Sequence, residues 1–409
     1  MICFDHLRET LSVMSRILIT TLILLFTFSA SAEPIEQLLK QRLGYMKDVA
    51  AYKWHKRMPV EDKARELLVL KNAVEHGLRF GFKPESSRQF FQIQIEAAKE
   101  IQQYWITQWN NQPREAPSVT PDLNHEIRPA LILLGNQITQ SLASVTHINS
   151  DLIRIEGLST ETLGRLANAI MHIQRFPNRL AQVLSTGVLR IGTTGDYAPF
   201  SLKAEDSYQG VDIDMGTNLA ESLGVEITWI ATTWPTLMSD LAEGKFDIGM
   251  SGISINLVRQ RTGLFSSAYH QGGKTPIIRC TDIDRFRTLT DIDQQSTRLV
   301  VNPGGTNQLY VASTIHNAKI RIHENNRTIF SEIANNRADV MITDNIEVEL
   351  QSKQNQELCA AMPGQTLTYS EKGYLLAQDI IWKEYIDVWL SQQIGDGTVS
   401  RIFSRHLAN

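Results

Sequence analysis

The chain has 409 residues, which at about 100–200 residues per domain predicts two or three domains. Hydrophobic residues make up 42% of the sequence and charged residues 21%, a balance typical of a globular protein and not of a disordered one. The 40 Lys and Arg nearly cancel the 44 Asp and Glu, so the net charge is −4 at pH 7. This balance argues against nucleic acid as the main partner, because phosphate binding needs concentrated positive charge.

The first 32 residues have the features of a secretion signal. Arg16 precedes an apolar run over residues 17–28, and residues 29–32 (SASA) end in the small-residue pattern of a cleavage site. Cleavage after Ala32 leaves an exported soluble protein in this interpretation. The alternative is an uncleaved membrane anchor, although the run is shorter than the roughly 18 residues that a spanning helix needs.

Two cysteines, Cys280 and Cys359, remain after such cleavage, because Cys3 lies in or before the signal. An even pair in an oxidising compartment favours a disulfide. Two buried free thiols are the alternative.

Residues 34–176 are predicted to be helical nearly throughout. Apolar residues recur at spacings of three and four up to Lys53, and Pro59 ends that first helix. The same reasoning predicts further helices over residues 60–78, from Pro84 past Trp105, and over residues 123–143 and 159–175, with a proline-rich loop over residues 110–121.

The pattern changes near Leu180, where short strands begin to alternate with helices. Strands are predicted over residues 188–191, 225–230, 246–250, 298–301, 319–322 and 340–342, and helices over residues 234–243, 308–313 and 329–335. This alternation favours α/β layers with parallel strands, in which binding sites lie at the carboxyl ends of the strands.

Two basic residues share an apolar helix face in the first half. Arg42 and Lys53 are eleven residues apart, close to three full turns, with Met46 and Val49 between them on the same stripe. Either acidic side chains or an anionic ligand would pair with them. Taken alone, the pattern favours long side chains that lie along an apolar edge with their charge in water.

Four stretches of the first half resemble the secreted, all-helical chorismate mutases: residues 49–54 (VAAYKW), 59–65 (PVEDKAR), 90–91 (FF) and 94–99 (QIEAAK). The resemblance implies rearrangement of chorismate to prephenate without acid, base, nucleophile or metal. In it, Arg42, Arg65 and Arg128 hold carboxylates, Lys53 and Gln102 flank the ether oxygen, and Asp62 accepts from the region of the substrate hydroxyl. Val69 and Ala98 depart from the polar residues that related enzymes commonly carry, and weaker binding is the expected result.

Three loops of the second half follow predicted strands and carry groups suited to carboxylate binding. They cover residues 251–254 (SGIS), with Arg259 close behind, residues 302–307 (NPGGTN) and residues 343–347 (TDNIE). Hydroxyl groups, glycine amides and helix N-termini all bind anions, and an arginine adds a bidentate clamp.

Three stretches of the second half resemble the polar-amino-acid periplasmic binding proteins: residues 192–200, 210–215 and 246–259. A more specific resemblance is to cyclohexadienyl dehydratase. It is carried by residues 193–197 (TTGDY), 234–235 (WP), 250–256 (MSGISIN) and 273–276 (GKTP), together with the loops over residues 302–307 and 343–347. This resemblance implies dehydration and decarboxylation of prephenate or arogenate, with Glu347 as a general acid whose pKa is raised by desolvation. Arg259, Ser254, Thr306 and Asn307 would hold carboxylates, Trp234 would wall the ring, and Asn302, Lys274 and Asp196 would line the site. Without the resemblance, Glu347 reads as an ordinary acid at a helix start.

The sequence thus predicts a multidomain protein: a signal over residues 1–32, an all-α chorismate mutase domain over residues 33–176, and a two-lobed α/β domain of the periplasmic-binding-protein type over residues 177–409. The expected function is a bifunctional periplasmic enzyme of phenylalanine biosynthesis acting on chorismate, prephenate and arogenate, with no cofactor and no metal. The rival is an amino-acid receptor fused to a helical domain without catalysis, in which Asp344 would pair with a ligand ammonium.

Overall fold

The computed structural model describes residues 33–205 and 207–408, so the predicted signal over residues 1–32 lies outside the described residues. The chain divides into two compact units. One runs to Gly77 and continues over Pro84–Ile173, and the other holds Leu78–Lys83 and Gln174–Asn409. The two units are described in turn.

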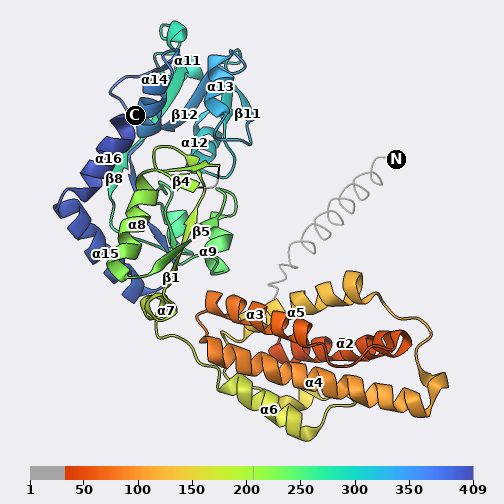
Figure 1. Cartoon of the computed structure of the whole chain (residues 1–409). Coiled ribbons are helices and arrows are strands. Elements are labelled where there is room, and N and C mark those ends of the chain that lie inside the picture. Colours follow the sequence, from red (N-terminus) through yellow and green to blue (C-terminus); the bar gives the residue numbers. More distant parts are fainter. Residues whose placement is uncertain (1–32, 206, 409) are drawn as a thin grey trace, which may run out of the picture. The chain divides into compact units, whose positions relative to one another are not determined.

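The first unit is helical (Figure 1). Its helices are α2 (Ile35–Lys56), α3 (Lys63–Arg79), α4 (Pro84–Asn111), α5 (Arg128–Ser141) and α6 (Thr160–Met171), with short helical turns at Pro113–Glu115, Leu123–Ile127 and Ser150–Ile153. Helix α4 packs against α2 and α6, and α2 also packs against α5. These spans follow the predicted order, and the predicted apolar faces form the core.

Local side-chain chemistry sets the helix starts. Helix α3 begins at Lys63 and not at the predicted residue 60, because the Asp62 carboxylate accepts from the backbone N–H of Arg65 at 3.1 Å and caps the helix. The helix ends at Arg79, one residue beyond its predicted end. Ser159 caps α6 by accepting from the N–H of Thr162.

The second unit contains two five-stranded sheets. In the first, β1 (Val188–Thr193) pairs in parallel with β5 (Glu226–Ala231) and β6 (Ile248–Gly249). In the second, β10 (Arg298–Val301) pairs in parallel with β11 (Lys319–Ile322) and β12 (Val340–Asp344). These strands are the ones that the sequence predicted, and the strands over residues 298–301 and 319–322 have the predicted bounds.

Each sheet also has antiparallel strands beside the predicted parallel ones. In the first sheet these are β15 (Leu375–Leu376) and β7 (Leu264–Phe265), and in the second they are β9 (Lys274–Arg279) and β13 (Leu358–Ala360). The reason is topological: the chain leaves the first sheet after β7, enters the second at β9, and returns to the first at β15. The two crossing segments, β8 (His270–Gly272) and β14 (Ser370–Lys372), pair with each other.

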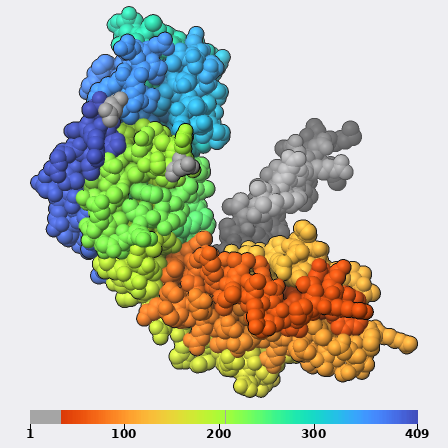
Figure 2. Space-filling view, in the orientation of Figure 1, coloured from red at the N-terminus to blue at the C-terminus, as the bar shows by residue number. Residues whose placement is uncertain are grey.

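Helices cover the two sheets of this unit. They are α7 (Arg179–Thr186), α8 (Val211–Leu223), α9 (Leu237–Ala242), α10 (Leu257–Gln260), α11 (Leu289–Ile292), α12 (Thr306–Thr314), α13 (Ile329–Ala334), α14 (Asn345–Gln354), α15 (Ile380–Gly395) and α16 (Thr398–Ala408), and a small sheet joins β2 (Asp196–Tyr197), β3 (Ser201–Ala204) and β4 (Ser207–Gln209). The C-terminal helices α15 and α16 form an outer layer of this unit, dark blue in Figure 2. None of the helices in the described ranges is both long and apolar enough to cross a membrane.

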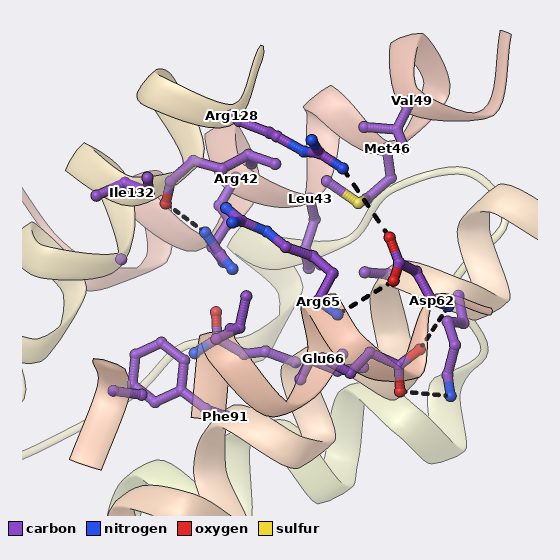
Figure 3. A pocket seen from close by; sticks show the side chains of 18 of the residues that line it. Arg42, Leu43, Met46, Val49, Asp62, Arg65, Glu66, Phe91, Arg128 and Ile132 are labelled. Atoms are coloured by element: carbon purple, nitrogen blue, oxygen red, sulfur yellow. Dashed lines mark hydrogen bonds and ion pairs between the residues drawn. The ribbon is translucent and has the colours of Figure 1, made fainter. Parts of the chain in front are cut away.

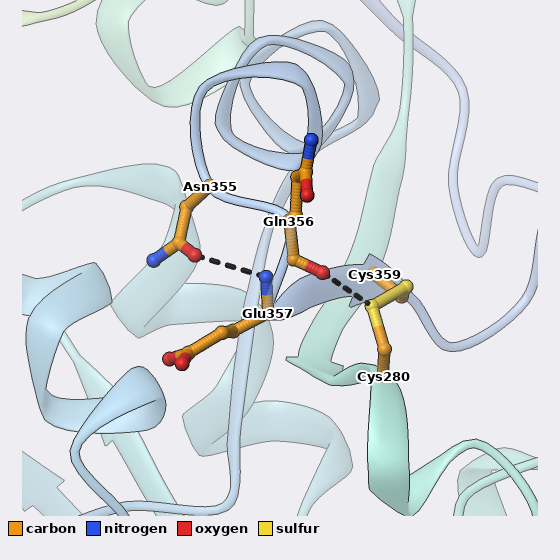
Figure 4. Close-up of a disulfide and its surroundings, with 5 residues drawn as sticks. All are labelled: Cys280, Asn355, Gln356, Glu357 and Cys359. Carbon is orange, nitrogen blue, oxygen red and sulfur yellow. Dashed lines mark hydrogen bonds between the residues drawn. A yellow bond between two sulfur atoms is a disulfide. The ribbon is translucent and has the colours of Figure 1, made fainter.

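A disulfide joins Cys280, which directly follows β9, to Cys359 in the neighbouring strand β13 (Figure 4). The two residues are 79 positions apart in the chain, with Cα atoms 4.9 Å apart. The predicted pairing is therefore confirmed, and the alternative of two free thiols is wrong. The bridge fastens the edge strand β13 to the rest of the second sheet.

We expect thiol titration of the denatured, unreduced protein beginning at Glu33 to find no free thiol. Replacing both Cys280 and Cys359 by Ala should lower the free energy of unfolding by about 2–4 kcal/mol, because the bridge no longer restricts the unfolded chain. Two titratable thiols in the unreduced protein would contradict the bridge.

Candidate active sites in the two units

A cavity in the helical unit brings together all six side chains that the sequence predicted there, of which Figure 3 labels Arg42, Asp62, Arg65 and Arg128. It encloses about 190 Å³ and is bounded by α2, α3, α4 and α5. The six are Arg42, Lys53, Asp62, Arg65, Gln102 and Arg128. Side chains far apart in the sequence thus converge on one space of a size suited to a small molecule.

Lys53 and Gln102 place a cation and an amide in buried parts of the cavity wall. The Lys53 ammonium donates to the Val60 carbonyl at 2.6 Å, and burial lowers the pKa of Lys53. Gln102 donates from Nε2 to the Ala98 carbonyl at 3.0 Å, while its Oε1 has no hydrogen-bond partner among the described residues. Both side chains therefore keep bonding capacity that a ligand can use.

The cavity has an excess of positive charge, since five Lys or Arg side chains face two carboxylates, Asp62 and Glu66. Both acids are engaged within the protein: Glu66 pairs with Lys99 at 3.1 Å, and Asp62 caps α3 and lies 3.9 Å from the Arg128 guanidinium. Among the described residues, no carboxylate forms an ion pair with the Arg42 guanidinium. The cavity is therefore suited to an anionic ligand.

The effect of this excess of positive charge is clearest in the lowered pKa of Arg42. Burial, with the nearby charge of Arg65 as a second cause, lowers the pKa of Arg42 to about 10. Its Nη1 donates to the Leu131 carbonyl at 2.5 Å. A neutral carbonyl compensates only part of the lost hydration of a guanidinium, and a bound carboxylate would supply the rest.

The second unit carries its predicted residues in a cleft lined by loops from both sheets. Seven of the nine line a narrow cavity of about 20 Å³: Trp234, Ser254, Arg259, Asn302, Thr306, Asn307 and Glu347. The other two adjoin it. The Asp196 carboxylate accepts from the Trp234 indole N–H at 3.1 Å, and the Lys274 ammonium donates to the Thr306 hydroxyl at 3.0 Å.

These side chains lie where the parallel strands end, as predicted for α/β layers. Ser254 follows β6, and Asn302 follows β10. Thr306 and Asn307 begin α12, so backbone N–H groups of its first turn face the same region. Glu347 lies in the first turn of α14, directly after β12.

Two neighbouring carboxyl groups in this cleft have opposite environments. Burial raises the pKa of Glu347 to about 8, although the Thr343 hydroxyl donates to its Oε2 at 2.5 Å, and the charge of Asp344 acts in the same direction as burial. Burial alone would raise the pKa of Asp344 as well, but the ammonium groups of Lys372 and Lys274 outweigh it and hold this pKa below its usual range. At neutral pH the cleft therefore holds one protonated and one ionised carboxyl.

The ionised Asp344 is fully engaged within the protein. Its Oδ1 accepts from Lys274 at 2.8 Å, and its Oδ2 accepts from Lys372 at 2.6 Å and from the Tyr197 hydroxyl at 2.5 Å. Lys372 also donates to the Ser254 hydroxyl at 2.9 Å. One carboxylate thus connects β2, β9, β12 and β14 across the cleft.

Arg259 supplies the cation of the predicted carboxylate site. It is buried, its Nη1 donates to the Ser254 carbonyl at 2.9 Å, and its guanidinium carbon lies 5.9 Å from the centre of the Trp234 ring. Burial lowers the pKa of Arg259 to about 10, opposed by the charge of Asp344. Within residues 33–205 and 207–408, no group of three or more His, Cys, Asp or Glu side chains is arranged to hold a metal ion.

The family model of the bacterial extracellular solute-binding proteins, family 3, matches residues 189–409. Over 229 residues, 56% of this chain and 85% of the relative, the sequence is 48% identical to cyclohexadienyl dehydratase of Pseudomonas aeruginosa. The chain belongs to family 3 of the bacterial extracellular solute-binding proteins. The crystal structure of the ancestral amino acid-binding protein AncCDT-1, a precursor of cyclohexadienyl dehydratase, is similar at 31% identity and a TM-score of 0.52, over 56% of this chain and 99% of that one.

This family 3 protein has a second family region in front of the solute-binding domain. The model of chorismate mutase type II matches residues 33–103. Over 141 residues, 34% of this chain and 74% of the relative, the sequence is 30% identical to a secreted chorismate mutase of Yersinia pestis. The predicted fold class, a helical chorismate mutase region followed by an α/β domain of the solute-binding type, is confirmed.

Sequence reasoning missed several residues of both sites in this family 3 protein. Lys99 and Gln94 line the helical cavity and lie within the quoted QIEAAK stretch, but nothing in that stretch singled them out. Lys372, Tyr197 and Asn326 line the cleft. Lys372 had no detectable signal, because its partner Ser254 lies 118 residues earlier in the chain.

Proposed function

We propose that this protein is a bifunctional exported enzyme of phenylalanine biosynthesis. Residues 33–176 would form the chorismate mutase domain, and residues 177–409 the domain that converts prephenate to phenylpyruvate, or arogenate to phenylalanine. Cleavage near Ala32 would release it into the periplasm. No cofactor is needed for either reaction. The observation that carries the proposal is Glu347, a buried acid held protonated at neutral pH in the cleft.

The first reaction is a pericyclic rearrangement, which requires positioning and charge stabilisation and no proton transfer. Arg42, Arg65 and Arg128 hold the two carboxylates of chorismate in a folded conformer. Lys53 and Gln102 stabilise the charge that builds on the ether oxygen as its bond to carbon breaks. The excess of cations and the spare bonding capacity of Gln102 support these roles.

The hydroxyl end of chorismate is assigned to Asp62. A carboxylate is the only charged group of the cavity that can accept a hydrogen bond from a substrate hydroxyl, and Asp62 keeps acceptor capacity beyond its capping bond. Glu66 is the less suitable acid, because its two oxygens serve Lys99 and the N–H of Asp62.

The second reaction requires an acid. Glu347 gives its proton to the departing ring hydroxyl, the carbon–oxygen bond breaks and water leaves. The bond between the ring and its carboxylate then breaks, its electron pair completes the aromatic ring, and carbon dioxide departs. A carboxyl with a pKa of about 8 is mostly protonated at pH 7, so the proton is available.

The remaining residues of the cleft bind the dicarboxylate and shape the space for the ring. Arg259, Ser254, Thr306 and Asn307 hold the carboxylates, and the indole of Trp234 forms a wall for the ring. The Asn307 side chain donates to the oxygens of Asn302 and Thr343 at 3.1 Å each, so its own contribution is its backbone N–H in the first turn of α12. Asn302, Lys274 and Asp196 support these groups from the edge.

The rival function is an amino-acid receptor, and the likeness to an ancestral amino acid-binding protein supports it. A receptor of this kind needs a carboxylate for the ligand ammonium, and Asp344 is the candidate. That carboxylate already accepts from two lysine ammonium groups and a tyrosine hydroxyl. A receptor also has no use for a protonated acid, so the enzyme is favoured.

Incubation of the purified protein with chorismate alone tests the proposal as a whole. We expect phenylpyruvate to accumulate without any added enzyme. Its formation is measured by its absorbance in alkali. A protein that binds an amino acid tightly and leaves chorismate unchanged would be a receptor.

Lys53→Ala should lower mutase turnover by about a hundredfold, because it removes a cationic donor from the ether oxygen. Dehydratase activity on supplied prephenate should be retained. The matched control is Lys56→Ala, which changes an exposed lysine of the same helix. Unchanged mutase turnover in Lys53→Ala would show that the ether oxygen is stabilised elsewhere.

Glu347→Gln should abolish most dehydratase turnover, because an amide of the same shape has no proton to give. Prephenate should still bind and should accumulate from chorismate, since the mutase site is untouched. The wild-type dehydratase rate should fall as the pH rises through about 8, where Glu347 loses its proton. Glu349→Gln, an exposed acid of the same helix, is the control, and normal phenylpyruvate formation by Glu347→Gln would refute the assignment.

A further inference from the structure

Gln94 lines the helical cavity, and the amide of its side chain is buried with all of its hydrogen-bonding capacity unused. Gln94 is 2% exposed and lines the cavity from α4. Neither its Nε2 nor its Oε1 has a hydrogen-bond partner among the described residues. The other buried glutamine of this wall, Gln102, at least donates to a carbonyl, so Gln94 is the less satisfied of the two.

The position of Gln94 follows from the register of the helices. Gln102 in α4 contacts Met46 in α2, and the Trp54 indole N–H in α2 donates to Asn110 in α4. Both pairs are 56 residues apart, so α2 and α4 run in the same direction with a constant offset. Gln94, Ala98 and Gln102 are spaced four apart and share one face of α4. In this register Ala98 lies level with Arg42.

The Arg42 guanidinium lies at the same end of the cavity as Gln94. Helical side chains lean toward the N-terminus of their helix, which carries Arg42 from the level of Ala98 toward that of Gln94. Its Nη1 and the Cε1 atom of Phe91 lie 3.7 Å and 3.9 Å from the point where a Cβ atom on Gly135 would be. Phe91 is the neighbour of Gln94 one turn earlier on α4, and Figure 3 shows Phe91 and Arg42 in the same cavity.

An amide buried without hydrogen-bond partners is unfavourable, and most buried polar groups in proteins have such partners. Met or Leu at this position would pack as well as Gln and avoid that loss. A ligand that forms hydrogen bonds with the amide would explain why glutamine occupies this position. The Arg42 guanidinium, which has no ion-pair partner among the described residues, indicates that this ligand group is anionic.

We propose that Gln94 is a further substrate-binding residue of the mutase site, whose Nε2 donates to the substrate carboxylate held by Arg42. This inference rests on the proposed mutase function. Ala98 lies level with Arg42 but has no polar group with which to contact the substrate. Gln94, one turn earlier on the helix, would supply that polar contact. Because this bond is present in both the bound substrate and the transition state, it acts on binding and not on the chemical step.

The test compares Gln94→Met, Gln94→Leu and Gln94→Glu with the wild-type protein in a chorismate mutase assay. Met and Leu keep an apolar chain of similar size, and both should raise KM for chorismate about tenfold or more with little change in kcat. Their melting temperatures should stay the same or rise, because an unsatisfied amide is removed. Glu should raise KM further, since its carboxylate repels that of the substrate. Gln103→Met, an exposed glutamine of the same helix, is the control.

The outcomes separate this inference from the function on which it rests. A wild-type protein without mutase activity would overturn the proposed function. An active wild type with unchanged KM in Gln94→Met and Gln94→Leu would overturn the role of Gln94 alone. Lower melting temperatures in both apolar variants with KM unchanged would show that the amide is structural, which also overturns it.

Discussion

The carboxylate of Asp344 is the group on which the cleft of the α/β unit depends. It lies at the end of β12 and accepts from Lys274 in β9, from Lys372 in the crossing strand β14, and from Tyr197 in β2. Four segments therefore meet on two oxygen atoms. The two ammonium groups keep this carboxylate ionised despite its burial, and the negative charge in turn helps to keep the neighbouring Glu347 protonated. Removing either lysine would change both carboxyl groups together.

The helical cavity follows the opposite design. Its carboxylates are committed to a helix cap and to Lys99, while Arg42 and Arg65 have no ion-pair partner in the described part of the chain. Cations without a counter-charge are unfavourable where they are removed from water, and a bound dianion would compensate them. The cavity is thus arranged to bind charge and not to transfer protons.

The sequence was sufficient to predict those features of the fold that depend on residues close together in the chain. Helix faces, strand positions and the loops after strands follow from periodicity and turn residues, and the structure brings the residues of those loops together. It was insufficient where partners lie far apart. The antiparallel strands arise because the chain crosses between sheets twice, and no local pattern encodes a crossing. Lys372 and the state of Asp344 depend on contacts across 28 to 147 residues. Gln94 could be quoted from the sequence, but its lack of partners is visible only in three dimensions.

Under the proposed function, both sites handle the same molecule, because prephenate is the product of the first and the substrate of the second. Both must therefore recognise two carboxylates, and each site has arginine in its lining: Arg42, Arg65 and Arg128 in the helical cavity, and Arg259 in the cleft. The difference lies at the oxygen whose bond to carbon breaks. In the rearrangement this oxygen stays in the product and only gains charge for a moment, so a fixed cation and an amide, Lys53 and Gln102, suffice. In the dehydration the oxygen departs as water and must take a proton with it, so a cation cannot replace an acid. That requirement explains why the cleft keeps Glu347 protonated beside an ionised Asp344. The rearrangement transfers no proton, so the helical cavity needs no acid.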